Sequence, residues 1–349
     1  MATRYIGIDV HSSSCTIAVM GPSGKRLREW QVETDHRVLV EAIKGVDGER
    51  YVCFEEGTLS DWLYQILEPA AKELQVIQPL KRRGTKNDSV DAWACAEAMR
   101  VQSRDVVRVF KAPKQFLSLR KATRAHLLIQ RDMVRVKNRI HASYRARGVR
   151  DLNDEIYDRK QRESWQAKLP PAQRRLVEHF CLELDGLVEA TQQAEAWLRE
   201  EASKVDVVRL LSTAPGIGIL RASHIVATVL TPHRFRTRSQ FWAYCGLGVV
   251  MRSSSDWCKT DSGWKRGVVA QTRGLKNGQP LLKNVFKGAA RTVLIMKDHP
   301  LKQRYQRQLS DGQKPNLAQL TLARRIAAAV LAMWKANQEY DVAKQQIAA

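Results

Sequence analysis

Four carboxylates in the first hundred residues have the types and the spacing of a metal-dependent site for chemistry at phosphorus. Asp9 and Glu55 each follow a short apolar run that is typical of a buried strand. The carboxyl ends of such strands are where open α/β sheets place their sites. Asp88 and Asp91 are three residues apart at the start of a helical pattern, so both carboxylates face the same way. The sequence therefore predicts that the four side chains converge.

Oxygen ligands of this kind suit Mg²⁺, with Mn²⁺ as the alternative ion, because these cations bind carboxylates together with the phosphate oxygens of a substrate. Two such ions can activate one oxygen and stabilise another during in-line displacement at phosphorus. The predicted substrate is a polynucleotide phosphodiester. A single aspartate after a strand is more often a turn or cap residue, and Asp88 could simply cap the helix that begins at Ser89. The order Asp, Glu, Asp-x-x-Asp on an alternating strand and helix pattern favours the catalytic interpretation.

The charge balance predicts a polyanionic partner. Lysine and arginine number 58 against 36 acidic residues, which gives a formal net charge of +22 and a pI near 10.0. A surplus of this size favours binding of nucleic acid and speeds encounter with it. It does not separate DNA from RNA, and a ribosomal or membrane-surface protein can have the same balance.

The apolar runs and the cysteines indicate where in the cell the protein is expected to be. No apolar run reaches the length of a membrane span and no secretory signal opens the chain, so we expect no membrane partner and a cytoplasmic location. The six cysteines are scattered and never form a C-x-x-C pair. This pattern predicts buried, reduced thiols and no zinc site.

Residues 1–112 are predicted to form an α/β domain with a mixed sheet. Strands are expected at 5–8, 16–20, 28–32, 51–54 and 74–77, and helices at 38–43, 62–71 and 89–99. The first three strands have the pattern of an antiparallel meander. Three strands, a helix, a strand, a helix and another strand are the order of an RNase H-like domain.

Residues 113–206 are predicted to form a long coiled-coil helical hairpin. Apolar residues recur at helical spacing over 116–147 and 171–205, and a Pro-Pro pair separates the two runs. Positive side chains crowd the outer face of the first helix, among them Arg120, Lys121, Arg124, Arg131 and Arg135. A solvated bundle face would also carry charge, but such faces usually mix the signs. The excess of one sign predicts contact with nucleic acid.

Residues 207–349 are predicted to be mostly helical. Helices are expected before 229 and at 239–244, 281–296 and 317–338, with a polar stretch at 251–256. Gly216 and Gly218 form a Gly-x-Gly turn between helices, which would let the N–H groups at the following helix start approach a phosphate, as in a helix-hairpin-helix DNA contact. Pro-Gly turns between helices are common, so an ordinary connection is the alternative.

In these ordered motifs the chain resembles the transposases of the IS110 family of bacterial insertion sequences, which are bridge-RNA-guided DNA recombinases. The resemblance covers nearly the whole length, and it is carried by residues 7–10, 54–58, 86–92, 214–218 and 241–247, followed by serines. It implies a RuvC-like catalytic domain whose acidic tetrad is Asp9, Glu55, Asp88 and Asp91.

Glu56 competes with Glu55 for the second place in the tetrad, because Glu-Glu-Gly departs from the family's usual Glu-Ala-Thr-Gly spacing. We prefer Glu55, which directly follows the strand residue Phe54, since Glu56 would point to the opposite face.

The family also uses a serine of its C-terminal domain as nucleophile. Counting from the Gly-Leu pair at 246–247 gives Ser254, with Ser253 and Ser255 as neighbouring alternatives. From the residues alone, the three serines read as a flexible polar loop.

The resemblance implies DNA recombination, in which a metal-assisted serine forms a phosphoserine link and an element-encoded RNA selects donor and target DNA. We expect a homodimer or homotetramer in the bacterial cytoplasm. The alternatives are a Holliday-junction resolvase that uses metal-activated water, and a basic nucleic-acid-binding scaffold with structural carboxylates. Metal-dependent activity separates the scaffold from both enzymes, and a protein–DNA adduct separates the serine mechanism from the resolvase.

Overall fold

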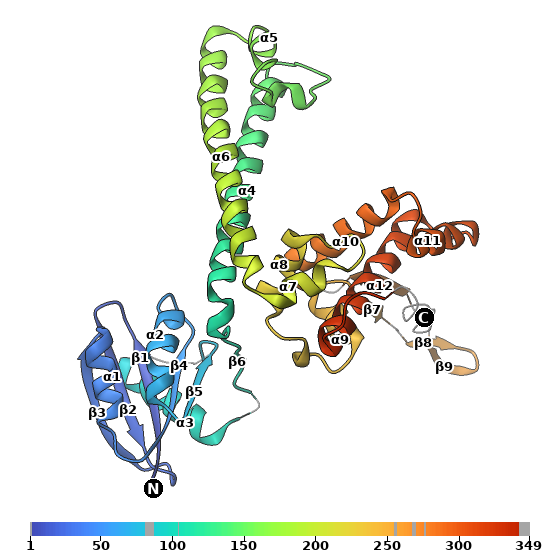
Figure 1. The fold of residues 1–349 in the computed structure, drawn as a ribbon. Helices are drawn as coiled ribbons and strands as arrows, with labels where there is room; N and C mark the ends of the chain where they lie inside the picture. The colour runs from blue at the N-terminus through green and yellow to red at the C-terminus, as the bar shows by residue number, and fades with distance from the viewer. Residues whose placement is uncertain are drawn as a thin grey trace. The chain divides into compact units, whose positions relative to one another are not determined.

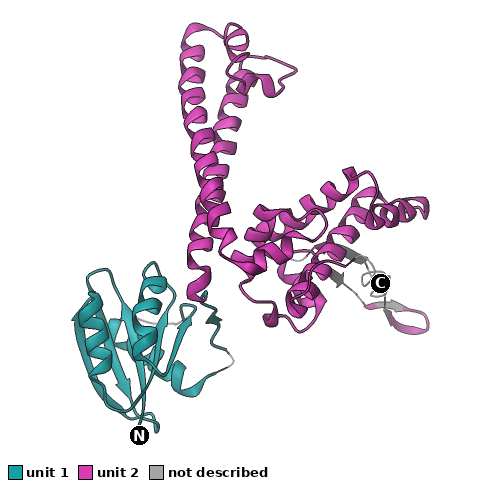
Figure 2. Ribbon diagram, viewed as in Figure 1, with its two compact units in different colours: residues 1–112 teal, residues 113–349 magenta. Residues whose placement is uncertain are grey.

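The computed structural model describes residues 2–80, 87–103, 105–254, 257–266, 270–275 and 277–341. The chain divides into two compact units, Met1–Ala112 and Pro113–Ala349. Figure 2 shows the first unit in teal and the second in magenta.

The first unit is built on a six-stranded mixed sheet with the strand order β3-β2-β1-β4-β5-β6. Strand β1 pairs antiparallel with β2 and parallel with β4, and β4 pairs parallel with β5. The sheet is consistent with the predicted RNase H-like α/β domain. Its strands are β1 (Thr3–Val10), β2 (Ser14–Met20), β3 (Arg26–Glu33), β4 (Glu49–Glu55), β5 (Glu73–Ile77) and β6 (Arg108–Val109).

Helices cover both faces of this sheet (Figure 1). Helices α1 (His36–Lys44) and α2 (Ser60–Leu67) contribute Leu39, Ile43, Leu63 and Leu67 to a core that includes Ile6, Ile8 and Phe54 of the strands. A short 3₁₀ turn, η1 (Glu68–Ala70), follows α2 and contains Pro69. Helix α3 (Asp88–Val101) packs on the opposite face through Ala92, Trp93 and Ala96.

Glycine at position 7 lets α3 lie directly on β1. A Cβ added to Gly7 would overlap the carbonyl oxygen of Ala92 and the amide nitrogen of Ala96. The backbone of α3 therefore touches the backbone of β1, which is possible only without a side chain at this position.

The second unit begins with a long antiparallel pair of helices, α4 (Leu117–Arg145) and α6 (Pro171–Ser203), which lie side by side in Figure 1. A 3₁₀ turn, η2 (Lys114–Phe116), precedes α4. At the far end, Val136, Ile140 and Tyr144 of α4 pack with Cys181 and Leu184 of α6. The connection between the helices contains η3 (Asp154–Tyr157) and α5 (Arg162–Gln166).

The rest of the second unit is mainly helical, as expected, and its longer helices agree with the predicted ranges. Helix α11 is an addition to the predicted elements. The elements are α7 (Asp206–Ser212), α8 (Ile219–Val229), η4 (Pro232–Arg234), α9 (Arg238–Tyr244), α10 (Pro280–Ile295), α11 (Pro300–Ser310) and α12 (Pro315–Ala336).

Four short strands between α9 and α10 correct the interpretation of the polar stretch. β7 (Val249–Ser254) pairs antiparallel with β10 (Ala270–Leu275), and β8 (Trp257–Thr260) pairs with β9 (Gly263–Arg266). Ser253 and Ser254 lie in β7, so the flexible-loop interpretation is wrong for them. Ser255 lies outside the described residues.

Helix α12 bears on the prediction that no apolar run reaches the length of a membrane span. By length and composition alone it could span a membrane, although the apolar runs of the sequence predict no such span. Half of its apolar stretch is buried, and it packs against α10, α9 and α7. These contacts are those of a core helix.

The described cysteines confirm the prediction of buried thiols. Five of the six have described side chains, and all five are free and buried: Cys15, Cys53 and Cys95 in the first unit, and Cys181 and Cys245 in the second. The side chain of Cys258 lies outside the described part of the chain.

Candidate metal centre of the first unit

Strand alternation places the strand carboxylates on the face that α3 covers. Successive side chains of a strand point to opposite faces. Ile6 and Ile8 pack toward α1 and α2, whereas Gly7 meets α3. Asp9 therefore points to the α3 side. On β4, Phe54 packs in the α1 and α2 core, so Glu55 also points to the α3 side.

The start of α3 brings two further carboxylates to this place. The side-chain oxygen of Asn87 accepts a hydrogen bond from the backbone N–H of Ser89, which makes Asn87 the N-cap. Asp88 is the first helical residue, so the interpretation of Asp88 as the cap is wrong. Asp88 and Asp91 both lie in the first turn, where the positive end of the helix dipole stabilises carboxylates.

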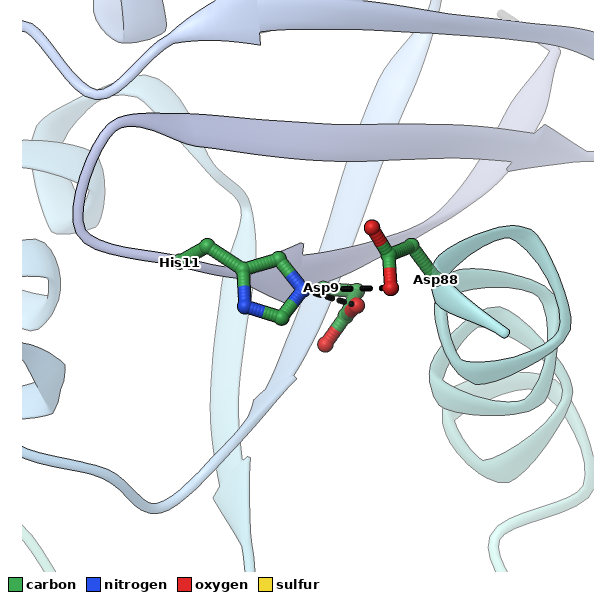
Figure 3. A group of neighbouring side chains, drawn as sticks. All are labelled: Asp9, His11 and Asp88. Carbon is green, nitrogen blue, oxygen red and sulfur yellow. Dashed lines mark hydrogen bonds and ion pairs between the residues drawn. The ribbon is translucent and has the colours of Figure 1, made fainter. Parts of the chain in front are cut away.

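Asp9, Asp88 and an unpredicted histidine form one tight group. The Nε2 atom of His11 lies 3.1 Å from Oδ2 of Asp9 and 3.3 Å from Oδ1 of Asp88. The ligand atoms of the three side chains lie within 4.8 Å of one another. Figure 3 shows the imidazole and the two carboxylates pointing toward a common centre. His11 is two residues beyond Asp9, a spacing that places both on one side of an extended chain and could have revealed it.

The electrostatics of Asp9 show that Asp91 also lies near. The Asp9 side chain is only 15% exposed. Burial raises the pKa of Asp9, the contact with His11 lowers it, and the negative charges of Asp88 and Asp91 raise it again. Like charges held together disfavour ionisation. A cation among them would offset both the repulsion between the carboxylates and the cost of burying a negative charge. The donor set therefore fits a divalent metal ion.

Glu55 and Glu56 differ in their surroundings. The half-buried Glu55 accepts a hydrogen bond at Oε1 from the backbone N–H of Leu80, at 3.0 Å. The exposed Glu56 lies 3.7 Å from Nζ of Lys111, whose ammonium also donates to Ser60 and Asp61. Glu55 shares the sheet face of Asp9, but it is not part of the tight group that Asp9, His11 and Asp88 form.

Comparison with known protein families settles what kind of protein carries this centre. Residues 6–144 match the DEDD transposase model of the IS110 family, and residues 208–306 match the transposase model of the IS116/IS110/IS902 family. The chain belongs to the IS110 family of transposases. It is thus a DNA recombinase, and DNA is its partner. A search of curated proteins finds no match.

The predicted nucleophile of this transposase lies in the second unit. Ser254 is the last residue of β7 and pairs with Ala270 of β10. Its neighbour Ser253 pairs with Gln271. The hairpin of β8 and β9, which has exposed Trp257 and Trp264, lies between these two strands in the sequence.

The basic residues of α4 lie on its outer surface. Lys121, Arg124, Arg131 and Arg135 are exposed and Arg120 is half-buried. Arg135 pairs with Asp132 one turn earlier, at 2.6 Å. The face is therefore accessible and predominantly positive, as a surface that meets a nucleic-acid backbone must be.

The two glycines of the Gly-x-Gly turn have different surroundings in the transposase. Gly216 has a φ of +69°, and an added Cβ would overlap the carbonyl oxygen of Ala289 on α10. The close approach to α10 and the positive φ both require glycine at this position. Gly218 is the exposed N-cap of α8, and an added Cβ there would meet no heavy atom within 4 Å. The contact of Gly216 and Gly218 with a phosphate stays a prediction.

Proposed function

We propose that this transposase exchanges DNA strands through a serine nucleophile, with Asp9, Glu55, Asp88 and Asp91 as the ligands of a divalent ion. The observation that carries the proposal is the convergence of Asp9 and Asp88 within one ligand group, with the charge of Asp91 close by. Mg²⁺ is the proposed ion, because the donors are carboxylate oxygens, and Mn²⁺ is the alternative.

The residues of the centre have separate tasks in this proposal. Asp9 and Asp88 face each other, and the hydrogen-bonded imidazole of His11 holds them in that arrangement. Asp91 adds negative charge from the same first turn of α3, and Glu55 from the neighbouring strand. When bound, the ion would supply a Lewis acid that stabilises charge on the phosphodiester.

Ser254 supplies the attacking oxygen. Its Oγ forms a bond to phosphorus, the bond from phosphorus to the leaving nucleotide oxygen breaks, and in net terms the hydroxyl proton passes to that oxygen. The phosphoserine bond replaces a phosphodiester bond of similar energy, so rejoining needs no ATP. Ser253 and Ser255 are the alternatives for this role.

We further propose three functional regions and two kinds of partner. Residues 1–112 form a RuvC-like catalytic domain, residues 113–206 a coiled-coil hairpin, and residues 207–349 the serine-bearing domain. The positive face of α4 contacts an element-encoded bridge RNA or the DNA. The transposase acts as a dimer or tetramer in the bacterial cytoplasm. Sequencing the RNA that co-purifies with the protein, expressed together with its flanking non-coding DNA, tests the guide.

The covalent step is tested by a denaturing gel of the transposase with its DNA substrate and Mg²⁺. The expected result is DNA attached to the wild-type protein and lost in Ser254→Ala and in Asp9→Ala. Ser310→Ala, an exposed serine of α11, is the matched control and should keep the adduct. If Ser253→Ala or Ser255→Ala loses the adduct instead, the nucleophile is that residue.

A water-using resolvase is the competing function, since all four carboxylates belong to the first unit and such an enzyme needs no serine from the second. Normal strand exchange by Ser253→Ala, Ser254→Ala and Ser255→Ala, each without an adduct, would contradict the serine mechanism. The carboxylates would then act on water.

A further inference from the structure

A cavity of about 550 Å³ lies between α9, α11 and α12 of the second unit. Five cationic side chains line it: Arg238, Arg304, Arg324, Arg325 and Lys335. Within the described residues, no acidic side chain is part of the lining. The volume is in the range of sites that enclose a small ligand or one residue of a larger one.

The guanidinium group of Arg324 is held in a fixed position at the wall of this cavity. Its Nε donates to the carbonyl oxygen of Leu247 at 2.7 Å, which fixes the guanidinium group. Its Nη2 is buried and has no hydrogen-bond partner among the described residues. A buried donor without an acceptor is costly, and a buried cation without a counter-charge is more so. Nη2 itself is covered by protein, so an anion inside the cavity would balance the charge of this guanidinium without contacting that atom.

The neighbouring Arg325 adds to the uncompensated positive charge around the cavity. Burial lowers the pKa of Arg324 and of Arg325, and the positive charge of Arg304 lowers that of Arg325 further. Arginine still stays protonated at neutral pH. Cations crowded around a partly dehydrated space repel one another until an anion of several charges, or a chain of phosphates, enters.

An aromatic wall gives the cavity a second chemical property. Trp242 of α9 lines it, and its indole N–H donates to the carbonyl oxygen of Arg324 at 2.9 Å, so the ring is held in place by α12. The Arg238 guanidinium carbon lies 5.7 Å from the centre of the ring. A fixed indole beside arginines is the arrangement on which an unstacked base rests while its phosphate is neutralised.

We propose that this cavity binds one unpaired nucleotide of a single-stranded nucleic acid, with its phosphate on Arg304, Arg324 and Arg325 and its base against Trp242. The residues that line the cavity include neither the four carboxylates nor Ser254, and the proposal does not depend on the serine mechanism. A base stacked inside a duplex cannot enter such a cavity. The site therefore recognises a single strand, a flipped nucleotide or a strand end, from RNA or from DNA.

The test uses the full-length transposase and fluorescence anisotropy with three probes: a mixed-sequence single-stranded RNA, the same sequence as DNA, and the duplex. Arg304→Gln with Arg325→Gln removes two lining charges but leaves Arg324 and its hydrogen bond to Leu247. The matched control is Arg291→Gln with Arg307→Gln, two exposed arginines of α10 and α11 outside the cavity with the same change in net charge. A second pair compares Trp242→Leu with Trp197→Leu, a tryptophan of α6.

The cavity variants should bind the single-stranded probes at least about ten-fold more weakly than their controls. The salt slope of binding should also fall by roughly 0.7 for each phosphate that is no longer neutralised. Binding of the duplex should change by less than about two-fold. A weakening confined to RNA assigns the cavity to RNA, and a weakening confined to DNA assigns it to a DNA strand.

Single-strand affinities within about two-fold of the controls, for both cavity variants, would overturn the proposal. A measurement on the unmodified protein guards against misfolding of the variants. Photo-crosslinking of an oligonucleotide that carries a 4-thio- or 5-iodo-pyrimidine should attach it to the tryptic peptide that contains Trp242. Crosslinks found only in other peptides would contradict the assignment independently.

Discussion

At the scale of single residues, His11 links two carboxylates of the acidic group. Its Nε2 lies between Asp9 and Asp88, in hydrogen-bond reach of both. Four carboxylates without such a neighbour would repel one another and splay apart in the absence of a cation. The imidazole keeps two of them together, so the proposed metal centre would be arranged for a cation before one arrives. This preorganisation is what a histidine adds to an otherwise acidic set.

The carboxylates are tested most directly by Asp9→Asn and Asp88→Asn. Both changes should abolish strand cleavage yet leave nucleic-acid affinity largely intact, because lysine and arginine contacts to phosphate dominate the affinity. Addition of Mg²⁺ should raise the melting temperature of the wild-type protein and not that of Asp9→Asn, since only a bound ligand stabilises the folded state. Full cleavage by Asp9→Asn in Mg²⁺ would show that the centre is structural.

The choice between the two neighbouring glutamates is decided in the same assay. Glu55→Ala should lose far more activity than Glu56→Ala, because only Glu55 shares the sheet face of Asp9 and the start of α3. The reverse order would assign the second ligand to Glu56.

At the scale of elements, the approach of α3 to β1 positions the site. Gly7→Ala would force the helix away from the strand, because the added Cβ overlaps the backbone of Ala92. Asp88 and Asp91 are on that helix and would move with it. We expect a loss of about 1–3 kcal/mol in unfolding free energy and a large loss of cleavage. Gly57→Ala, where an added Cβ meets nothing within 4 Å, is the control.

Helix α4 carries the next prediction. Changing Arg120, Arg124, Arg131 and Arg135 together to Glu should weaken nucleic-acid binding and flatten its dependence on salt, because counterion release scales with the phosphates that are neutralised. The measurement is affinity at several salt concentrations. An unchanged affinity and slope would mean that the positive face is only a solvated surface of the hairpin.

A buried pair of histidines makes the junction of α4 and α8 sensitive to acid. His126 of α4 and His224 of α8 lie with ring centres 5.7 Å apart, and each has one ring nitrogen without a partner among the described residues. Burial, then repulsion from His126 and Arg221, lowers the pKa of His224 to about 4. Burial also lowers the pKa of His126, with Glu195 of α6 opposing it.

Because the folded state keeps His224 neutral, its contribution to stability is complete above the unfolded pKa of about 6.5 and is lost as the pH falls toward 4. The loss amounts to at most about 3 kcal/mol. Melting temperatures between pH 7 and pH 4 should fall less steeply in His224→Leu than in the wild type. His233→Leu, an exposed histidine, should keep the wild-type slope.

The elements differ in how well the sequence predicts them. The strands of the first unit follow from short apolar runs between turn residues, and their order is enough to indicate the mixed sheet. Helix α11 is hard to predict because its mean hydropathy is low and charged residues interrupt its apolar spacing. Strands β7 to β10 have no hydrophobic alternation, so only their pairing with each other reveals them.

The site is predictable from the sequence in the same uneven way. Strand ends and helix starts indicate Asp9, Asp88 and Asp91, because local spacing fixes where such side chains point. The role of His11 depends on a turn after β1 and on a helix nearly eighty residues later. The cavity that Arg324 lines depends on three helices packing together, and spacing within one helix carries no sign of it.

At the scale of the whole molecule, the family models and the compact units divide the chain at different residues. The DEDD transposase match runs from residue 6 to residue 144, through almost all of α4. The compact units instead separate after Ala112. The family model thus includes the basic helix α4 together with the sheet of the first unit. In the structure, however, α4 packs with α6 in the second unit. A truncation after residue 112 keeps the sheet but discards the basic helix.

Each unit contains buried cysteines whose chemical modification can report its opening. Burial raises the pKa of Cys15 in the first unit and of Cys181 and Cys245 in the second, so these thiols are both covered and protonated. Alkylating reagents attack thiolates, and only when they can reach them. Pulsed alkylation followed by peptide mass mapping would therefore register the opening of each unit separately, with no introduced label, and oxidants should leave these five thiols of the closed molecule unlinked.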